Sequence, residues 1–202
     1  MNKPAIAVVG YARSGKGQVA QILKQRGFEL FSGGDVLRRI ARDRELSIGR
    51  YQLIELGNLL REEFGSDILM RGAMQAARRI DQTPAQRGFV VDSLRNPAEV
   101  SFLKNELGAF VINVESSDEV RFARIQKYPK PGDPENWYEF IGLDAIDRGY
   151  GQISSGQNIA GCVALADVTL QNDTTIEDLE GKVDGLLASK SMIEGSGRIE
   201  RF

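Results

Sequence analysis

The sequence predicts an α/β protein with a five-stranded parallel β-sheet that is flanked by helices. Three observations carry this prediction. Short β-rich runs alternate with longer helical segments, the runs are almost continuously apolar, and a glycine-rich loop joins the first run to the first helix. Alternating strands and helices form parallel sheets, and strands buried on both faces are apolar along their whole length. At 202 residues, the chain has the length of one domain with small insertions.

The expected strands are apolar runs that cover residues 5–9, 28–31, 89–92, 110–114 and 168–171. The expected helices cover residues 16–26, 35–44, 48–63, 67–80, 97–107, 118–127 and 176–187. Two of the helix starts carry capping signals. Asn96, Pro97 and Glu99 stand at the N-cap, N1 and N3 positions of one helix. Ser66 and Asp67 provide a cap for the helix that follows them.

The alternation of strands and helices is interrupted twice. Residues 45–82 contain two successive helical segments with no strand between them, which indicates a helical insertion. Residues 128–160 are rich in Pro, Gly and polar groups, a composition typical of a lid with a short helix. Residues 191–202 are expected to form a flexible tail. We therefore expect a single domain with a core that comprises residues 1–44, 83–127 and 161–190.

Composition excludes several classes of site. The chain has no histidine, so His-based triads, imidazole proton shuttles and His-ligated zinc are excluded. A single cysteine, Cys162, excludes an internal disulfide framework and a cysteine-rich metal site. The net charge of −2 argues against a large polyanionic partner. Since the chain shows neither a membrane-length apolar run nor a signal peptide, we expect a cytoplasmic protein with no membrane partner.

The loop GYARSGK, residues 10–16, has the G-x-x-x-x-G-K spacing and lies directly between a predicted strand and a predicted helix, the context of a P-loop NTPase. Its glycines allow backbone N–H groups to line an anion-sized concavity, and the helix N-terminus adds partial positive charge. Lys16 can reach the β- and γ-phosphates of ATP. A glycine-rich turn that binds nothing is the alternative. The residues expected to bind the ATP phosphates are Gly10, Arg13, Ser14, Gly15, Lys16, Gly17 and Gln18.

The two residues after Lys16 depart from most such loops, which offer a hydroxyl to Mg²⁺ at this point. Gly17 and Gln18 carry no hydroxyl. The run GKG resembles the adenylate kinase branch of the nucleoside monophosphate kinases, in which GKGT is usual. The resemblance implies that carboxylates, acting through water, hold Mg²⁺ in place of a loop hydroxyl.

The stretch FSGGDVLRR, residues 31–39, is similar to the STGDxLR stretch of the same kinases. The resemblance implies that the helical insertion binds the phosphate acceptor and that Gly34 lies at the acceptor site. It also implies that Asp35 orients metal-bound water and that Arg38 binds the acceptor phosphate. The alternative is an N-cap aspartate followed by a solvated basic helix face.

The stretch GFVVDSLRNPAEV, residues 88–100, is similar to the LDGFPR motif of these kinases. Asp92 follows an apolar strand, at the end where ligands bind in open α/β sheets. The resemblance implies that Asp92 holds Mg²⁺ or its water ligands and that Arg95 clamps the acceptor phosphate. Leu94 replaces the proline of the motif. A simple strand-end turn is the alternative.

The predicted lid begins after a basic helix face that includes Arg121, Arg124 and Lys127. The resemblance to the monophosphate kinases implies that Arg124 stacks on the donor adenine. It also implies that Lys127 or Lys130 contacts the transferred phosphoryl group. The alternative is a basic helix end that only balances the helix dipole.

The stretch ALADVTLQND, residues 164–173, resembles the ADxxIxN ending shared by dephospho-CoA kinases and an archaeal kinase-like family. This resemblance implies that Asn172 borders the donor base. Together the motifs cover nearly the whole chain in the order of that archaeal family. Dephospho-CoA kinases carry D-x-D after the second strand, whereas this chain has Gly33, Gly34 and Asp35, which counts against dephospho-CoA as the acceptor.

These motifs predict an ATP- and Mg²⁺-dependent kinase that phosphorylates a small phosphate-bearing acceptor, a nucleoside or deoxynucleoside monophosphate. Transfer to an ionised phosphate requires no strong base, so positioning and electrostatics suffice. One alternative is a hydroxyl acceptor, such as dephospho-CoA or a hydroxymethylated base in DNA, with Asp35 as the base. Another is a non-catalytic ATP-binding module, which the missing loop hydroxyl supports. The expected catalytic residues are Lys16, Asp35, Asp92, Arg95 and Lys127.

Overall fold

The computed structural model describes residues 3–196, and at residues 50 and 190–196 it describes the backbone alone. Its centre is one parallel sheet with the strand order β2-β3-β1-β4-β5. Every neighbouring pair is parallel, which confirms the predicted sheet. The strands are β1 (Ala5–Val9), β2 (Phe28–Ser32), β3 (Gly88–Asp92), β4 (Phe110–Glu115) and β5 (Val168–Gln171).

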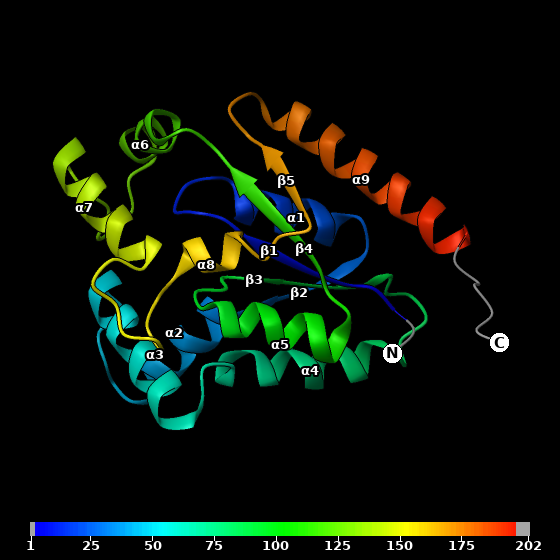
Figure 1. Cartoon of the computed structure of the whole chain (residues 1–202), viewed down its shortest axis with the longest axis horizontal. Coiled ribbons are helices and arrows are strands. Elements are labelled where there is room, and N and C mark those ends of the chain that lie inside the picture. The colour runs from blue at the N-terminus through cyan, green and yellow to red at the C-terminus, as the bar shows by residue number, and fades with distance from the viewer. Residues whose placement is uncertain (1–2, 197–202) are drawn as a thin grey trace.

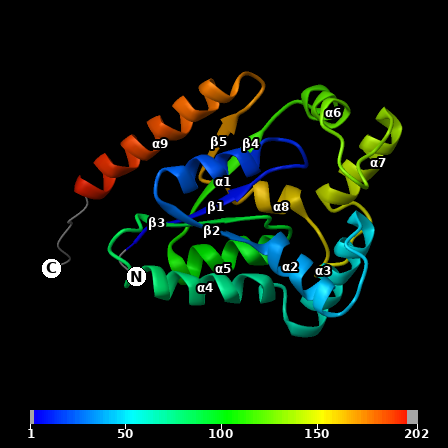
Figure 2. The ribbon, with the colours of Figure 1, turned by 180° about the vertical axis from the view of Figure 1, so that it is seen from behind.

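Helices cover both faces of the sheet, as Figure 1 and, from behind, Figure 2 show. None of the helices within residues 3–196 is long and apolar enough to cross a membrane. In chain order the helices are α1 (Lys16–Gln25), α2 (Gly33–Asp43), α3 (Arg50–Phe64), α4 (Ile68–Ile80), α5 (Pro97–Leu107), α6 (Asp118–Lys127), α7 (Trp137–Arg148), α8 (Ile159–Val163) and α9 (Ile176–Ser196).

The central strand β1 explains why two separate cores form. Side chains of a strand alternate between the two faces of its sheet. Ala5, Ala7 and Val9 are buried in the core beneath α4 and α5. Ile6 and Val8 are buried in the opposite core, with residues of α1 and α9. A strand buried on both faces is apolar at every position, which is why β1 reads as a continuous apolar run.

Helix boundaries show where the local signals succeed. The capping box of Asn96 and Glu99 is present, with Pro97 at the start of α5. At α4 the expected cap is absent, because Asp67 holds the N-cap position without a side-chain capping bond and pairs with Arg71 instead. Helix α9 runs to Ser196, so the first part of the expected tail is helical backbone; residues 197–202 lie outside the described residues.

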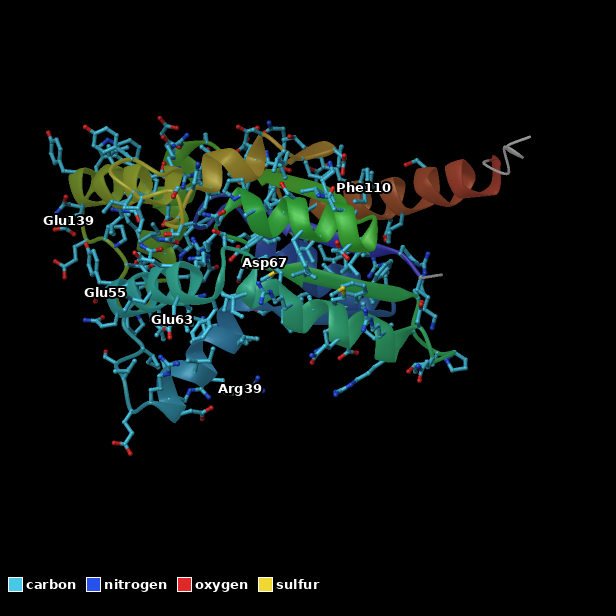
Figure 3. All side chains as sticks on the ribbon, turned by 60° about the horizontal axis from the view of Figure 1, so that its bottom comes forward. Arg39, Glu55, Glu63, Asp67, Phe110 and Glu139 are labelled. Carbon is cyan, nitrogen blue, oxygen red and sulfur yellow. The ribbon has the colours of Figure 1, made fainter. Side chains whose placement is uncertain are left out.

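The insertion and the lid segment lie side by side at one end of the molecule. Figure 3 shows Glu55 of α3 and Glu139 of α7 at this end. The amide of Asn58 in α3 donates to Gln152 of the lid segment at 3.2 Å. Asn96 at the start of α5 donates to the carbonyl oxygens of Ser154 and Gly156, at 3.0 and 2.8 Å. These bonds hold residues 152–156 against the insertion and the edge of the core.

Candidate functional site

The loop between β1 and α1 has backbone conformations that only glycine tolerates without strain. Gly10 has a φ of 145° and Gly15 a φ of 102°. A Cβ atom on Gly15 would lie 2.0 Å from Nδ2 of Asn172, and one on Gly10 would lie 2.4 Å from the carbonyl oxygen of Val114. Both distances are far too short for a side chain. The close approach of β4 and of the segment after β5 therefore requires glycine at both positions.

Three carbonyl groups of the loop accept from side chains that do not line the cavity described below. The carbonyl oxygen of Ser14 accepts from Ser116 Oγ at 3.1 Å and from Asn172 Nδ2 at 2.7 Å. The carbonyl oxygens of Ala12 and Arg13 accept from arginines of α6, each at 3.1 Å. In a trans peptide the N–H points opposite to the C=O. The N–H groups of Arg13 and Gly15 therefore point to the other side, where an anion can be bound.

Arg124 is one of these arginines. Its guanidinium donates to the carbonyl oxygens of Arg13 (3.1 Å), Ser14 (3.3 Å) and Asn172 (2.6 Å), and to Ser116 Oγ at 2.9 Å. Burial lowers the pKa of Arg124 from its ordinary value. The residue predicted to stack on adenine thus also braces the phosphate loop. Ser116, which sequence reasoning missed, follows the carboxyl end of β4, a position that could have signalled it.

A second brace involves Tyr11 of the loop and two arginines from α6 and α7. The guanidinium carbon of Arg148 lies 4.2 Å from the centre of the Tyr11 ring and that of Arg121 lies 5.3 Å from it. Arg121 is fully buried and donates to Asp144 at 2.7 Å and to Asp118 at 2.7 Å. Arg121 therefore links helix α7 to the phosphate loop and does not face solvent.

The pKa of Asp144 reflects this network. Burial would raise it, but hydrogen bonds from Arg121 and Arg148 outweigh burial and hold the pKa below its ordinary value. For Tyr11, burial dominates and raises the pKa of the phenol. Both groups stay in the charge state that suits the network near neutral pH, with Asp144 ionised and Tyr11 neutral.

A cavity of about 360 Å³ lies between the loop, the insertion, the end of β3 and the lid segment. Its cationic lining consists of Arg13, Lys16, Arg38, Arg61, Arg95 and Lys130. Two carboxylates, those of Asp133 and Asp147, also line it. The apolar part of the wall consists of Leu37, Ile48, Leu53, Ile54 and Leu69. Because the cations outnumber the carboxylates, this cavity favours an anionic ligand.

Six of the predicted site residues line this cavity. They are Arg13 and Lys16 of the phosphate loop, Gly34 and Arg38 of α2, Arg95 after β3 and Lys130 after α6, so four separate segments meet at one cavity. Lys16 Nζ donates to the carbonyl oxygen of Tyr11 at 3.1 Å, within its own loop. Of the two lysines predicted to contact the transferred phosphoryl group, Lys130 lines the cavity and Lys127 does not. Lys127 Nζ lies 5.3 Å from the centre of the Tyr128 ring instead.

Asp35 lies apart from this cavity lining. Its side chain is 73% exposed and pairs with Arg38 at 2.5 Å. Helix α2 begins earlier than expected, at Gly33, because the side chain of Ser32 caps it by accepting from the N–H of Asp35. Asp35 therefore stands in the first turn of α2, and the alternative in which it is the N-cap residue is wrong.

Asp92 fits a role in holding a hydrated cation. It ends β3, and its Oδ1 atom is buried with no hydrogen-bond partner among the described residues. Buried carboxylate oxygens are normally paired, so this atom is suited to bind a water molecule or a cation. Within residues 3–196, no cluster of three or more acidic, Cys or His side chains could hold a metal ion alone.

The segment predicted as a lid, residues 128–160, is tied to the phosphate loop by an ion pair. Arg13 donates to Asp133, and the same carboxylate accepts from the N–H of Lys130 at 2.9 Å. Both side chains are largely buried, at 16% and 12% exposed. The pair connects residues far apart in the chain, so sequence reasoning had no signal for it.

Sequence reasoning also missed Arg61, Asp147 and Gln157. Arg61 is buried in α3 and its Nε donates to Glu99 at 2.8 Å, while Glu99 accepts from the N–H of Arg95 at 2.7 Å. Asp147 Oδ2 lies 3.7 Å from Arg95 Nη1. Two carboxylates thus hold the two arginines at the cavity wall. A weak signal for Arg61 was Gly57, one helical turn earlier, where a Cβ atom would lie 3.2 Å from the guanidinium.

Comparison with known proteins agrees with this architecture. The family described as an AAA domain matches residues 6–139. A shikimate kinase from Acinetobacter baumannii, solved in complex with shikimate, has a TM-score of 0.52 at 17% identity, covering 94% of this chain and 95% of that one. A gluconokinase from Sinorhizobium meliloti 1021 has a TM-score of 0.52 at 14% identity, covering 96% and 97%. At these identities the likeness shows the fold, which is that of the P-loop kinases.

Sequence relatives extend over almost the whole chain. A UPF0200 protein from Hyperthermus butylicus is 30% identical and covers 95% of this chain and 96% of its own length. A UPF0200 protein from Pyrococcus horikoshii is 28% identical and covers 91% and 95%. This agrees with the archaeal kinase-like resemblance of the sequence motifs. The chain therefore belongs to the AAA-domain P-loop proteins and, within them, to the UPF0200 family.

Proposed function

We propose that this protein transfers the γ-phosphoryl group of ATP to a small phosphate-bearing acceptor, a nucleoside or deoxynucleoside monophosphate. The observation that carries the proposal is the shared cavity, which brings Lys16 of the phosphate loop together with Arg38 and Arg95. A donor phosphate site alone would not require these two arginines. Arginine forms bidentate bonds to phosphate, so they suit the phosphate of a second substrate.

Each group has a distinct task in this mechanism. The loop N–H groups and Lys16 hold the donor phosphates. Arg38 and Arg95 hold the acceptor phosphate in line with them, and Lys130 adds positive charge from the lid side. P-loop kinases generally use Mg²⁺ with ATP; Asp92 would hold this ion through water, and the ion would neutralise further phosphate charge. An acceptor phosphate is already ionised near neutral pH, so no proton has to be removed by a base.

A hydroxyl acceptor is the second candidate function. It is supported by the shared fold with a shikimate kinase and a gluconokinase. A hydroxyl must lose its proton during transfer, and Asp35 would be the base for that step. Asp35 is exposed and paired with Arg38, so this role would require Asp35 to leave Arg38 and turn towards the cavity.

A third candidate is a module that binds ATP without turnover, as the missing hydroxyl at Gly17 and Gln18 suggested. The cationic lining of the cavity argues against this third candidate, because Arg38, Arg95 and Lys130 would have no ligand to bind in a site for ATP alone.

The test is ADP release from ATP and Mg²⁺ with a panel of acceptors. The panel contains each ribo- and deoxynucleoside monophosphate, dephospho-CoA, shikimate, gluconate and DNA that contains hydroxymethyluracil. We expect turnover with at least one monophosphate, and a loss of about 100-fold or more in Lys16→Ala. Lys24→Ala is the matched control, because Lys24 is an exposed lysine of the same helix. Turnover with shikimate, gluconate, dephospho-CoA or DNA alone would favour the hydroxyl acceptor, and ATP binding without turnover would favour the third candidate.

A further inference from the structure

One polar group in the wall of the cavity has no role in phosphate binding. The side chain of Gln157 is buried, at 3% exposed, and lines the cavity. Its Nε2 atom has no hydrogen-bond partner among the described residues. Buried amide groups in proteins are nearly always paired. A ligand in the cavity is therefore the natural partner for this donor.

The bonds on either side of Gln157 fix its position. The carbonyl oxygen of Gly156 accepts from Asn96 at 2.8 Å, and the N–H of Asn158 donates to the carbonyl oxygen of Arg95 at 2.7 Å. Gln157 is thus anchored on both sides to the segment that carries Arg95. A donor held in this way is preorganised, so little freedom is lost when a ligand binds to it.

Asp147 offers the complementary group. It is 1% exposed, lines the same cavity and lies 3.7 Å from Arg95 through its Oδ2 atom. An ionised carboxylate can only accept hydrogen bonds, whereas Gln157 Nε2 can only donate. A ligand that bonds to both must therefore present a donor and an acceptor of its own.

The remaining wall narrows the class of ligand further. Leu37, Leu53 and Ile54 from α2 and α3 provide apolar surface suited to the face of a ring. The cavity volume of about 360 Å³ lies at the lower end of the range for small-molecule sites, about 300–1,000 Å³. The cavity thus combines cations for a phosphate, apolar surface for a ring, and a donor–acceptor pair for a polar edge.

We propose that Asp147 and Gln157 form a specificity subsite that recognises the hydrogen-bonding edge of the acceptor's nucleobase. The inference rests on the proposed function and extends it, because it assigns the recognition of the base to two residues of the lid segment. Arg38 and Arg95 bind the phosphate of the same acceptor. Phosphate binding gives affinity that is common to many ligands, and the subsite separates nucleotides from other phosphate monoesters.

The experiment compares nucleoside monophosphates with ribose 5-phosphate, which has the same phosphate and sugar but no base. Affinities are measured by isothermal titration calorimetry, without ATP, so that the result does not depend on turnover. In the unaltered protein at least one monophosphate should bind about tenfold or more tightly than ribose 5-phosphate. In Gln157→Leu this preference should fall to less than about threefold, while ribose 5-phosphate binds as before.

A second variant and a control separate recognition from packing. Gln157→Glu keeps the shape but replaces the donor by an acceptor, so it should also lose the preference. Gln152→Leu changes a glutamine of the same lid segment that bonds to Asn58 outside the cavity lining, and it should keep the preference. Circular dichroism confirms that each variant is folded.

Three results would overturn the subsite. These are equal binding of ribose 5-phosphate and all monophosphates, an unchanged preference in both Gln157 variants, and no binding of either ligand class. The ADP-release assay distinguishes this failure from that of the proposed function. Turnover of a monophosphate whose affinity the Gln157 variants leave unchanged would remove the subsite and leave the kinase proposal standing.

Discussion

Replacing Gly15 by alanine tests how closely the phosphate loop is fitted to the sheet behind it. The new Cβ atom would lie 2.0 Å from Nδ2 of Asn172, and Gly15 has a φ of 102°. The variant must therefore hold alanine in a strained conformation and displace the Asn172 side chain. That displacement breaks the bond from Asn172 to the carbonyl oxygen of Ser14, which is 2.7 Å long.

The expected loss of stability follows from these two effects. A residue held in a strained backbone region costs about 1–3 kcal/mol. Loss of one hydrogen bond costs about 0.5–1.5 kcal/mol. We therefore expect Gly15→Ala to lower the free energy of unfolding by about 2–4 kcal/mol, measured by urea denaturation. The distorted loop should also reduce the rise in melting temperature that we expect ATP to produce.

Gly17→Ala is the matched control for stability, two residues further along the chain. Gly17 lies in the first turn of α1, and a Cβ atom there would meet no atom within 4 Å. Alanine at a free helical position should stabilise the protein by about 0.5–1 kcal/mol. A free energy of unfolding of Gly15→Ala within about 0.5 kcal/mol of that of the unaltered protein, or an equal loss in both variants, would refute the predicted clash with Asn172.

Three further predictions concern buried charge and the thiol. Arg61→Leu removes the ion-pair partner of the buried Glu99 carboxylate, which keeps only its bonds from backbone N–H groups. Because the two side chains are 2% and 0% exposed, this change should lower the free energy of unfolding in urea by about 3–5 kcal/mol. Asp144→Asn should lower the free energy of unfolding most above about pH 4, and progressively less below it. The reason is that folding lowers the pKa of Asp144, so the stabilisation by its ionised form is lost as the pH falls through the native pKa. Burial raises the pKa of Cys162 to about 12, so iodoacetamide should react with the native thiol at least about 100-fold more slowly than with the unfolded chain.

Each of these has a control and a contrary outcome. Arg71→Leu removes an exposed ion pair and should change stability by less than about 1 kcal/mol, and an equal loss in Arg61→Leu would contradict the first prediction. A cost of Asp144→Asn that stays constant from neutral pH to pH 3 would contradict the second. Rapid alkylation of Cys162 under native conditions, with the chain shown to be folded, would contradict the third.

Local sequence patterns were enough to predict the strands, the helices and the phosphate loop. The continuous apolar run of β1 predicts that the strand is buried on both faces, since its alternate side chains lie in the two cores. The capping box of Asn96 and Glu99 gives the start of α5, since all of its bonds form within four residues. The spacing from Gly10 to Lys16 likewise predicts the strand, loop and helix that surround it.

The same local patterns predicted that Arg38 and Arg95 lie at one edge of the sheet, near the phosphate loop. Arg38 and Arg95 each follow a strand of a parallel sheet, and the carboxyl ends of such strands meet at one edge. Because β3 lies beside β1 in the strand order, the residues that follow these strands can share one cavity with Lys16. Topology could not separate Lys127 from Lys130 in the same way, because that choice depends on how the chain turns after α6.

Only the tertiary structure decided the pairs that join distant segments. Arg61 meets Glu99 across 38 positions, and Arg13 meets Asp133 across 120. Gln157 lines the cavity because its neighbours bond to Asn96 and Arg95, and no local pattern in the sequence predicts these bonds. Periodicity, capping and loop spacing act within a few residues along the chain. Charge pairing and cavity shape depend on distances through space, which are set once the helices have packed on the sheet.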